Sequence, residues 1–283
     1  MFPGQASYTM VRTAAWRAAH QILDTPRIFE DPVAVGLVPE ASEQAIRDNA
    51  DDHGSLLNVL LRAAFVFRSR FTEERLAQAA ASGVRQYVIA GAGLDTFPWR
   101  QPPFATDMRI FFVDHPWTLA WSMERFRERG LSTPPNVTFV AADLEALELG
   151  ARLDEHGFNR QTATFCSVLG VMQYISRNAT EALLRFAASL PAKSEIVFTV
   201  SPPDDEMDSD ALATTVWSVA ATAATGEPWV TRLRALEVAG FLSSLGFGEV
   251  FHLTPQLAQE RYFSGRTDAL KATRIEDVFA ATV

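Results

Sequence analysis

The sequence contains a single cysteine, Cys166, among its 283 residues. One thiol excludes a disulfide within the chain and predicts a reducing compartment. Cys166 lies in an apolar stretch, where a cysteine is more often a small core residue than a nucleophile. The five histidines show no metal-ligand spacing with one another or with the cysteine, and none has an obvious partner, so we expect no metal site.

Long hydrophobic runs and an excess of positive charge are also missing. The longest uncharged stretch near the C-terminus, 211–226, is too short and too rich in threonine to span a bilayer. The first residues show no charged-then-apolar signal pattern. The net charge of −9 and the pI of about 5.1 argue against binding to nucleic acid or to anionic membranes. We therefore expect a cytoplasmic monomer or homodimer that binds a small molecule.

The chain is organised around a glycine-rich turn between two apolar segments. Residues 87–90 form a short apolar run, typical of a strand buried on both faces, and the run stops at Gly91 and Gly93. Glycines let the backbone turn sharply and approach a ligand closely. A second apolar run, 109–113, ends in Asp114, 21 positions after Gly93. This arrangement predicts a nucleoside site in a doubly wound α/β sheet, with the acid accepting hydrogen bonds from the ribose.

The segment after the turn distinguishes between nucleoside cofactors. A dinucleotide requires a third glycine and a helix that starts at once, but Pro98, Pro102 and Pro103 interrupt any long helix here. Asp95 would also place a carboxylate where a pyrophosphate sits. Two acids, Asp95 and Asp114, suit S-adenosylmethionine, which carries a sulfonium, an ammonium and an adenosine. A nicotinamide-dependent oxidoreductase is the alternative that these residues disfavour.

Five segments resemble, in the same order, the motifs of the leucine carboxyl methyltransferase family, in particular its bacterial branch of class I S-adenosylmethionine-dependent methyltransferases. The segments are AGAGLDT (90–96), VDHP (113–116), ADL (142–144), SVLGVMQYIS (167–176) and RYFSGRTDAL (261–270). The resemblance implies an α/β fold, a Rossmann-like, doubly wound seven-stranded sheet whose last strand is antiparallel, with an N-terminal helical cap. It specifies no substrate, and the protein-methylating activity of the eukaryotic members is not carried over.

The alternation of apolar and amphipathic segments agrees with a mostly parallel sheet covered by helices on both faces. The expected strands are 86–90, 109–113, 137–142, 163–169, 195–201, 247–253 and one near 274–282. The expected helices include 55–81, 117–129, 177–189 and 232–245, and the pair Asp31-Pro32 is a helix-start signal. We expect residues 1–85 to form the cap and residues 86–283 to form the catalytic domain.

The predicted cofactor-binding residues follow the ends of the expected strands, with one addition from the long helix. They are Arg68, Gly91, Gly93, Asp95, Asp114, His115, Asp143, Leu144 and Leu169. The resemblance implies that Asp143 takes the exocyclic amine of adenine and that the amide at Leu144 takes a ring nitrogen. His115 is expected near the adenosine. For Asp114 and Asp143, a helix cap is the structural alternative.

Arg68 lies on the apolar face of the helix expected at 55–81, about 20° from Leu57. An arginine on the same helix face as the core residues needs an anion to neutralise its charge. The resemblance implies that this anion is the methionine carboxylate of the cofactor. A structural salt bridge to an acid on a helix is an equally weighted alternative.

Leu169 is a departure from the family, because many members have a glutamate at this position. The function of that acid is either missing or supplied elsewhere, which leaves open a protein that binds a nucleoside without catalysis. Gln173 and Tyr174 are the polar side chains that remain nearby, and we predict that they orient a substrate oxygen, with ordinary packing as the alternative.

The predicted function is O-methylation of a small molecule, a carboxylate or an acidic hydroxyl of a secondary metabolite. A carboxylate is ionised at neutral pH and needs no general base, whereas a hydroxyl needs one, and none is evident. Residues 202–231 are predicted to form a mobile lid, because they carry prolines with Trp217 and Trp229. Most of the acids in 204–210 are interpreted as a solvated loop.

Overall fold

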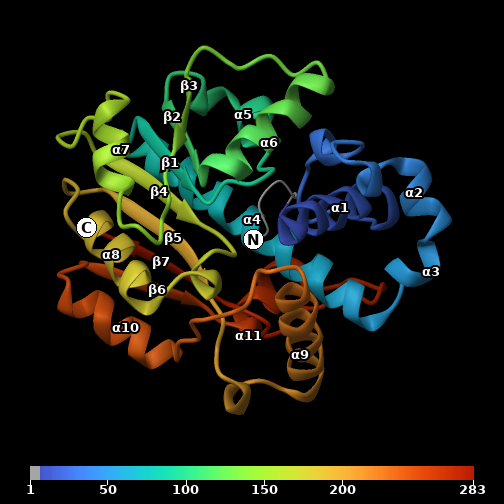
Figure 1. The fold of residues 1–283 in the computed structure, drawn as a ribbon. Helices are drawn as coiled ribbons and strands as arrows, with labels where there is room; N and C mark the ends of the chain where they lie inside the picture. The colour runs from blue at the N-terminus through green and yellow to red at the C-terminus, as the bar shows by residue number, and fades with distance from the viewer. Residues whose placement is uncertain (1–6) are drawn as a thin grey trace.

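The computed structural model describes residues 7–283, which form one seven-stranded sheet with helices on both faces (Figure 1). The strands are β1 (Gln86–Ala90), β2 (Arg109–Asp114), β3 (Val137–Ala141), β4 (Thr164–Val168), β5 (Glu195–Val200), β6 (Glu249–Leu253) and β7 (Asp277–Thr282). All seven expected strands are confirmed, with ends that differ by at most three residues. The first six residues of the predicted cap lie outside the described residues.

The sheet has the strand order β3-β2-β1-β4-β5-β7-β6. The five strands from β3 to β5 pair in parallel, whereas β7 runs antiparallel to both of its neighbours. The chain order reverses between β1 and β4, where Ile89 lies opposite Ser167. In doubly wound sheets, ligands bind at the carboxyl ends of the strands beside such a reversal. The predicted fold class is therefore confirmed, and its topology locates the site.

The helices are α1 (Tyr8–Leu23), α2 (Glu43–Asp48), α3 (Ala50–His53), α4 (Leu56–Ala81), α5 (Phe97–Arg100), α6 (Pro116–Glu128), α7 (Leu149–Glu155), α8 (Arg177–Ala188), α9 (Ser209–Ala224), α10 (Ala235–Ser244) and α11 (Pro255–Ala258). In Figure 1, α1, α2 and α3 lie on the opposite side of the molecule from α7, α8 and α10. Asp31 caps a 3₁₀ helix, Pro32–Ala34, with the proline at its first position, so the helix-start signal is confirmed, although the helix is a single 3₁₀ turn. Among residues 7–283, none of the helices combines the length and the apolar character that a membrane span requires.

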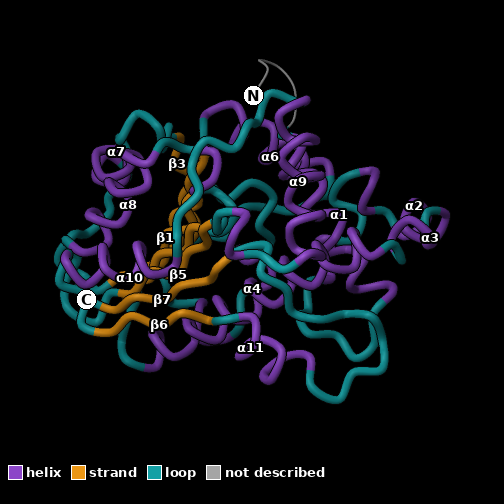
Figure 2. The backbone as a smooth tube through the Cα atoms, turned by 90° about the horizontal axis from the view of Figure 1, so that it is seen from below, coloured by secondary structure: helices purple, strands orange, loops and turns teal. Residues whose placement is uncertain are grey.

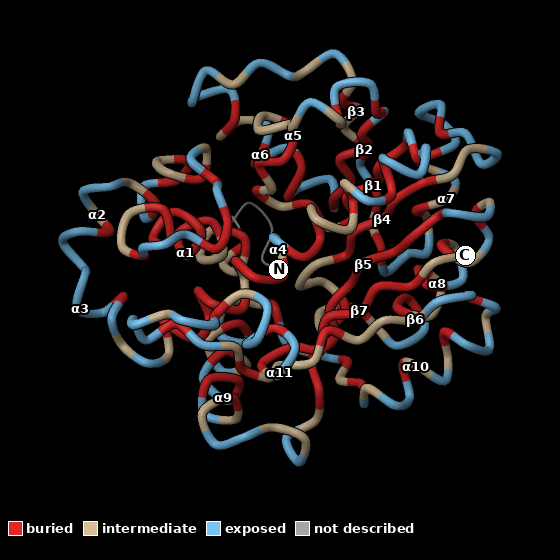
Figure 3. Tube along the Cα trace, turned by 180° about the vertical axis from the view of Figure 1, so that it is seen from behind, coloured by how far each residue is buried: buried red, intermediate tan, exposed pale blue. Residues whose placement is uncertain are grey.

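Alternate residues of the buried strands face two different hydrophobic cores, because side chains alternate along a strand. In β1, Tyr87 and Ile89 pack in the core that α1, α4, α5 and α6 share. Val88 and Ala90 belong to the core beneath α7, α8 and α10. Figures 2 and 3 show the strands as the buried centre between these layers. Cys166 is buried in the second core, and burial raises the pKa of its thiol to about 12, so its core role is confirmed.

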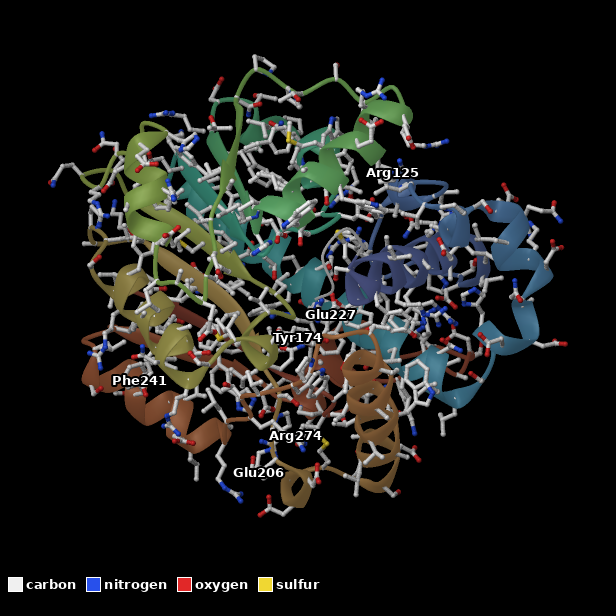
Figure 4. The ribbon with its side chains drawn as sticks, viewed as in Figure 1. Arg125, Tyr174, Glu206, Glu227, Phe241 and Arg274 are labelled. Atoms are coloured by element: carbon white, nitrogen blue, oxygen red, sulfur yellow. The ribbon has the colours of Figure 1, made fainter. Side chains whose placement is uncertain are left out.

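The acids of segment 204–210 are mostly exposed, which agrees with their interpretation as solvated charges, and each of them also has a specific partner. Asp204 pairs with Arg232, Asp205 with Arg234, Glu206 with Arg234 and Arg274, and Asp210 with Lys271, while Asp208 caps α9. Figure 4 labels Glu206 and Arg274 at the base of this segment. These pairs fasten the start of α9 to the chain that follows it and to the chain just before β7.

Candidate active site

A cavity of about 740 Å³ lies at the carboxyl ends of β1, β2 and β4, within the size range of small-molecule sites. All residues that the sequence predicted for the cofactor and for catalysis line it. Helices α1 and α4, which belong to the predicted cap, contribute side chains, and the segment after β5 contributes side chains from α9 and the loop that follows. The cavity is therefore assembled from parts that are far apart in the sequence.

The turn after β1 requires its first glycine for two reasons. Gly91 has a φ of +70°, which is the left-handed region. A Cβ built on Gly91 would lie 2.2 Å from Cγ2 of Val171, in the turn after β4. The amides of Gly91 and Ala92 both donate to the carbonyl of Val113, so the turn folds tightly against β2.

Asp114 holds this turn in place from the end of β2. Its Oδ2 accepts a hydrogen bond from the amide of Gly93 at 2.6 Å, and its Oδ1 accepts one from the amide of His115 at 2.7 Å. Burial raises the pKa of Asp114 to about 6, although the hydrogen bonds from Gly93, His115 and Thr118 oppose the rise. The cap of α6 is His115, whose Nδ1 accepts from the amide of Trp117, so the helix-cap alternative for Asp114 was wrong.

Asp95 and Asp143 each close a local turn with one carboxylate oxygen. Oδ1 of Asp95 accepts from the amide of Phe97 at 2.8 Å, and Oδ1 of Asp143 accepts from the amide of Glu145 at 2.9 Å. Both are Asx turns, which fix the direction of the side chain. No helix begins at Asp143, so its side chain caps a turn rather than a helix.

Arg68 forms a buried ion pair that the sequence did not identify. Its Nη1 lies 2.6 Å from Oε2 of Glu276, the residue immediately before β7, and the guanidinium lies over the ring of Phe65. The sequence-based alternative was a salt bridge to an acid on a helix. A salt bridge does form, but its acid, Glu276, is 208 positions from Arg68 and lies on no helix. Both members of the pair line the cavity. No local pattern in the sequence marks Glu276.

Gln173 and Tyr174 belong to a short 3₁₀ helix, Met172–Tyr174, after β4. The carbonyl of Gln173 accepts a hydrogen bond from the amide of Val230, and the ring of Tyr174 packs edge-on against Trp229. Burial raises the pKa of Tyr174 to about 12, so the phenol stays protonated near neutral pH. Tyr174 can donate a hydrogen bond, but it does not act as a base under these conditions.

The cap and the segment after α9 meet across the cavity. Oε2 of Glu227 accepts a hydrogen bond from the amide of Thr9, at the start of α1. Figure 4 shows Glu227 and Tyr174 between the cap and the sheet. The sequence predicts a lid that carries Trp217 and Trp229. Both side chains line the cavity. Whether this segment moves stays a prediction.

Arg12 is a cavity residue that sequence reasoning missed. Its guanidinium lies over the ring of Trp16, and Nη2 donates to Oδ1 of Asn58 at 3.3 Å. No carboxylate lies within ion-pair distance of Arg12 in the part of the chain that the structure describes. The other two arginines that line the cavity, Arg17 and Arg68, are paired with acids. Arg12 is thus the cavity arginine that is open to an anionic ligand.

Two histidines have acidic partners, contrary to the sequence-based expectation. Nδ1 of His20 lies 2.8 Å from Oδ2 of Asp24, and Nε2 of His252 lies 3.0 Å from Oδ1 of Asp277. Neither pair lines the cavity. Nε2 of His20 accepts from the amide of Ile28, so the pair organises the end of α1. Within residues 7–283, no three acidic, histidine or cysteine side chains gather in a way that would hold a metal ion.

The chain matches the model of the leucine carboxyl methyltransferase family over residues 10–188. Similar proteins include YktD of Bacillus subtilis, named as an S-adenosyl-L-methionine-dependent methyltransferase, which is 31% identical and is covered over 96% of both chains. A Mycobacteroides abscessus protein with the same description is 30% identical and covers 78% of this chain and 72% of its own.

Two solved structures share the fold across almost the whole chain. A protein of Thermobifida fusca named as a methyltransferase has a TM-score of 0.58 at 15% identity, over 95% of this chain and 93% of its own. A DUF574 family protein of Streptomyces avermitilis has a TM-score of 0.57 at 17% identity, over 95% of this chain and 96% of its own. At these identities the likeness concerns the fold alone.

Proposed function

The chain belongs to the leucine carboxyl methyltransferase family, and from that premise we propose that it methylates an oxygen of an anionic small molecule. It is an S-adenosylmethionine-dependent methyltransferase. Family membership removes the nicotinamide-dependent oxidoreductase that the sequence left open. The acceptor, the atom methylated and the role of each cavity residue belong to the proposal.

The shape of the glycine turn and the charges in the cavity support the proposed cofactor site. A Cβ on Gly91 would collide with Val171, so the turn that borders the cofactor site requires a glycine. In the proposal, Asp114 accepts the ribose hydroxyls with the lone pairs that the amides leave free, and Asp143 with the amide of Leu144 binds adenine. Gly93 and His115 border the nucleoside, Leu169 packs against it, and Asp95 faces the cationic end. Arg68 takes the methionine carboxylate.

When bound, the cofactor supplies an electrophilic methyl group on a sulfonium that leaves as a neutral thioether. The residues of this chain hold the acceptor oxygen in line with that methyl group, and such positioning can supply on the order of 7–11 kcal/mol. In the proposal, Gln173 and Tyr174 donate hydrogen bonds to the acceptor. Because charge is lost as an anionic oxygen attacks a sulfonium, exclusion of water by the aromatic walls favours the reaction.

The observation that carries an anionic acceptor is the position of Arg12. It lines the cavity without an acid partner, and its guanidinium lies over the ring of Trp16, which packs against Phe65. A guanidinium without an acid partner in such a place favours a carboxylate or a phenolate, which it binds through charge-assisted hydrogen bonds. A carboxylate acceptor also accounts for the absence of an evident base.

The proposed acceptor class is tested by turnover on a panel of small aromatic carboxylic acids and acidic phenols, with the matching amides as controls. We expect S-adenosylhomocysteine to form with the acids and not with the amides. Arg12→Met is expected to lower kcat/KM for the acids by roughly 10- to 100-fold, because it removes a charge-assisted contact. Arg127→Met, on the exposed face of α6, serves as the control. Equal turnover of neutral acceptors by wild type would contradict the proposal.

Cofactor binding is predicted to strengthen as the pH rises through about 6, where the Asp114 carboxyl ionises. Below that pH the free protein holds Asp114 protonated, so the apparent affinity for S-adenosylhomocysteine falls by up to about tenfold per pH unit. Above it, the carboxylate is already formed and the affinity levels off. Calorimetric titration between about pH 5 and pH 8 measures the step, and Asp114→Asn is expected to remove it. A flat wild-type profile would rule out ionisation of Asp114 as a condition for binding.

We infer that 202–231 acts as a lid over the acceptor, since Trp217 and Trp229 line the cavity from this segment. Limited proteolysis with and without S-adenosylhomocysteine tests the inference. We expect cleavage around α9 to slow when the ligand is present, because the aromatic side chains then pack against an occupied cavity. Cleavage at the same rate in both conditions would count against a lid.

A further inference from the structure

Glu276 is an acid of the cavity wall that has one buried oxygen without a hydrogen-bond partner among the described residues. One oxygen, Oε2, accepts from Arg68, but the other, Oε1, is buried and has no hydrogen-bond partner among the described residues. The side chain is only 9% exposed and lines the cavity. A buried carboxylate oxygen without a donor is costly, and its presence in a cavity points to a donor brought by a ligand.

The pair of Arg68 and Glu276 lies beside the turn that follows β4. A Cβ on Gly170 would be 2.8 Å from Nη2 of Arg68, so the guanidinium packs directly against that residue. The amide of Gly170 donates to Oγ1 of Thr199. Burial raises the pKa of Glu276, and the positive charge of Arg68 opposes this rise. The pair is therefore next to Leu169, where many family members have a glutamate.

Opposite charges held side by side match the end of the cofactor that is itself a zwitterion. An α-amino acid presents a carboxylate and an ammonium a few ångströms apart, and the Arg68–Glu276 pair presents the complementary charges. Leu169 offers no charge at this point, and Asp95 uses one of its oxygens in a turn.

We propose that Oε1 of Glu276 binds the α-ammonium of the cofactor. Glu276, immediately before β7, then supplies the acid that is missing at Leu169. Arg68 binds the adjacent carboxylate, and both contacts form without separating the pair. This inference rests on the proposed function, in which the same cavity holds S-adenosylmethionine. It assigns Glu276 to cofactor binding and not to proton transfer from the acceptor.

The test compares two ligands on wild type and on Glu276→Gln. S-adenosylhomocysteine has the amino-acid end, whereas 5′-methylthioadenosine lacks it and keeps the nucleoside. We expect Glu276→Gln to weaken S-adenosylhomocysteine by roughly 10- to 100-fold, the loss of a charge-assisted hydrogen bond, and to leave 5′-methylthioadenosine unchanged. If the glutamine variant does not fold, Glu276→Asp keeps the charge but withdraws it by one methylene, and the same selective loss is expected.

Glu195→Gln is a matched control, because Glu195, the first residue of β5, pairs with Arg75 of α4 at 2.5 Å outside the cavity. It is expected to lower the melting temperature without changing either affinity. Equal weakening of both ligands by Glu276→Gln would show a structural role and overturn the inference. Unchanged affinities with reduced turnover would make Glu276 an acceptor base and also overturn it. Failure of wild type to bind S-adenosylhomocysteine would instead refute the proposed function.

Discussion

Asp114→Ala is expected to reduce the affinity for S-adenosylhomocysteine by a factor of roughly 100 to 1,000. The carboxylate accepts hydrogen bonds from the amides of Gly93 and His115 at 2.6 and 2.7 Å, so its removal releases the glycine turn. It also removes the proposed acceptor of the ribose hydroxyls. Hydrogen bonds to a charged group contribute about 1.5–3 kcal/mol each, and two of them near the lower end of this range give a loss of this size.

Asp114→Asn refines this experiment, because the amide keeps the shape and only one of the two acceptor oxygens. We expect an affinity between those of wild type and Asp114→Ala, measured by calorimetric titration. Asp24→Asn is the control: Asp24 is equally buried, accepts from Arg62 and lies outside the cavity. That variant should melt at a lower temperature and bind normally once folded. Wild-type affinity in Asp114→Ala would remove Asp114 from the site.

Gly91→Ala is expected to abolish cofactor binding and to destabilise the fold. The left-handed backbone at Gly91 costs an alanine about 1–2 kcal/mol, and the new Cβ would lie 2.2 Å from Cγ2 of Val171. Real Cβ atoms do not approach other atoms so closely, so either the turn or Val171 must shift into the cavity. The melting temperature and the affinity for S-adenosylhomocysteine measure the two effects.

Gly83→Ala is a control that has the backbone strain of Gly91→Ala without its steric clash. Gly83 also has a positive φ, +98°, but a Cβ there meets nothing within 4 Å. It should therefore lose stability without losing ligand affinity. Val171→Ala removes the colliding methyl group, and the double variant Gly91→Ala/Val171→Ala should regain part of the binding, a coupling that a double-mutant cycle quantifies. Purely additive effects would show that the two residues do not meet.

The features that could be predicted from the sequence are those that lie within a few residues of one another. The apolar run 87–90 ending at Gly91 predicts a buried strand and a sharp turn, because strand burial and left-handed backbone depend on local side chains. Asp114 could be placed for the same reason, as an acid at the end of the next strand. In parallel strands the carboxyl ends lie at one edge, so local motifs converge in space.

The ion-pair partners of the acids in 204–210 could not be predicted, because these partners are distant in sequence. Asp210 pairs with Lys271, 61 positions away, and Glu206 with Arg274, 68 positions away. A run of charges does not indicate which cation will lie beside it. Only the packing of α9 against the chain before β7 brings the partners together.

The sequence by itself determined the fold class, the glycine turn, the acids at the strand ends and the choice of cofactor. The tertiary structure decided that Arg68 meets Glu276, that Arg12 lacks an acid and that α1 and α9 enclose the cavity. The physical reason is one of range. Turn geometry, strand burial and helix periodicity depend on neighbours in the chain, whereas the environment of a buried charge depends on which segments pack around it.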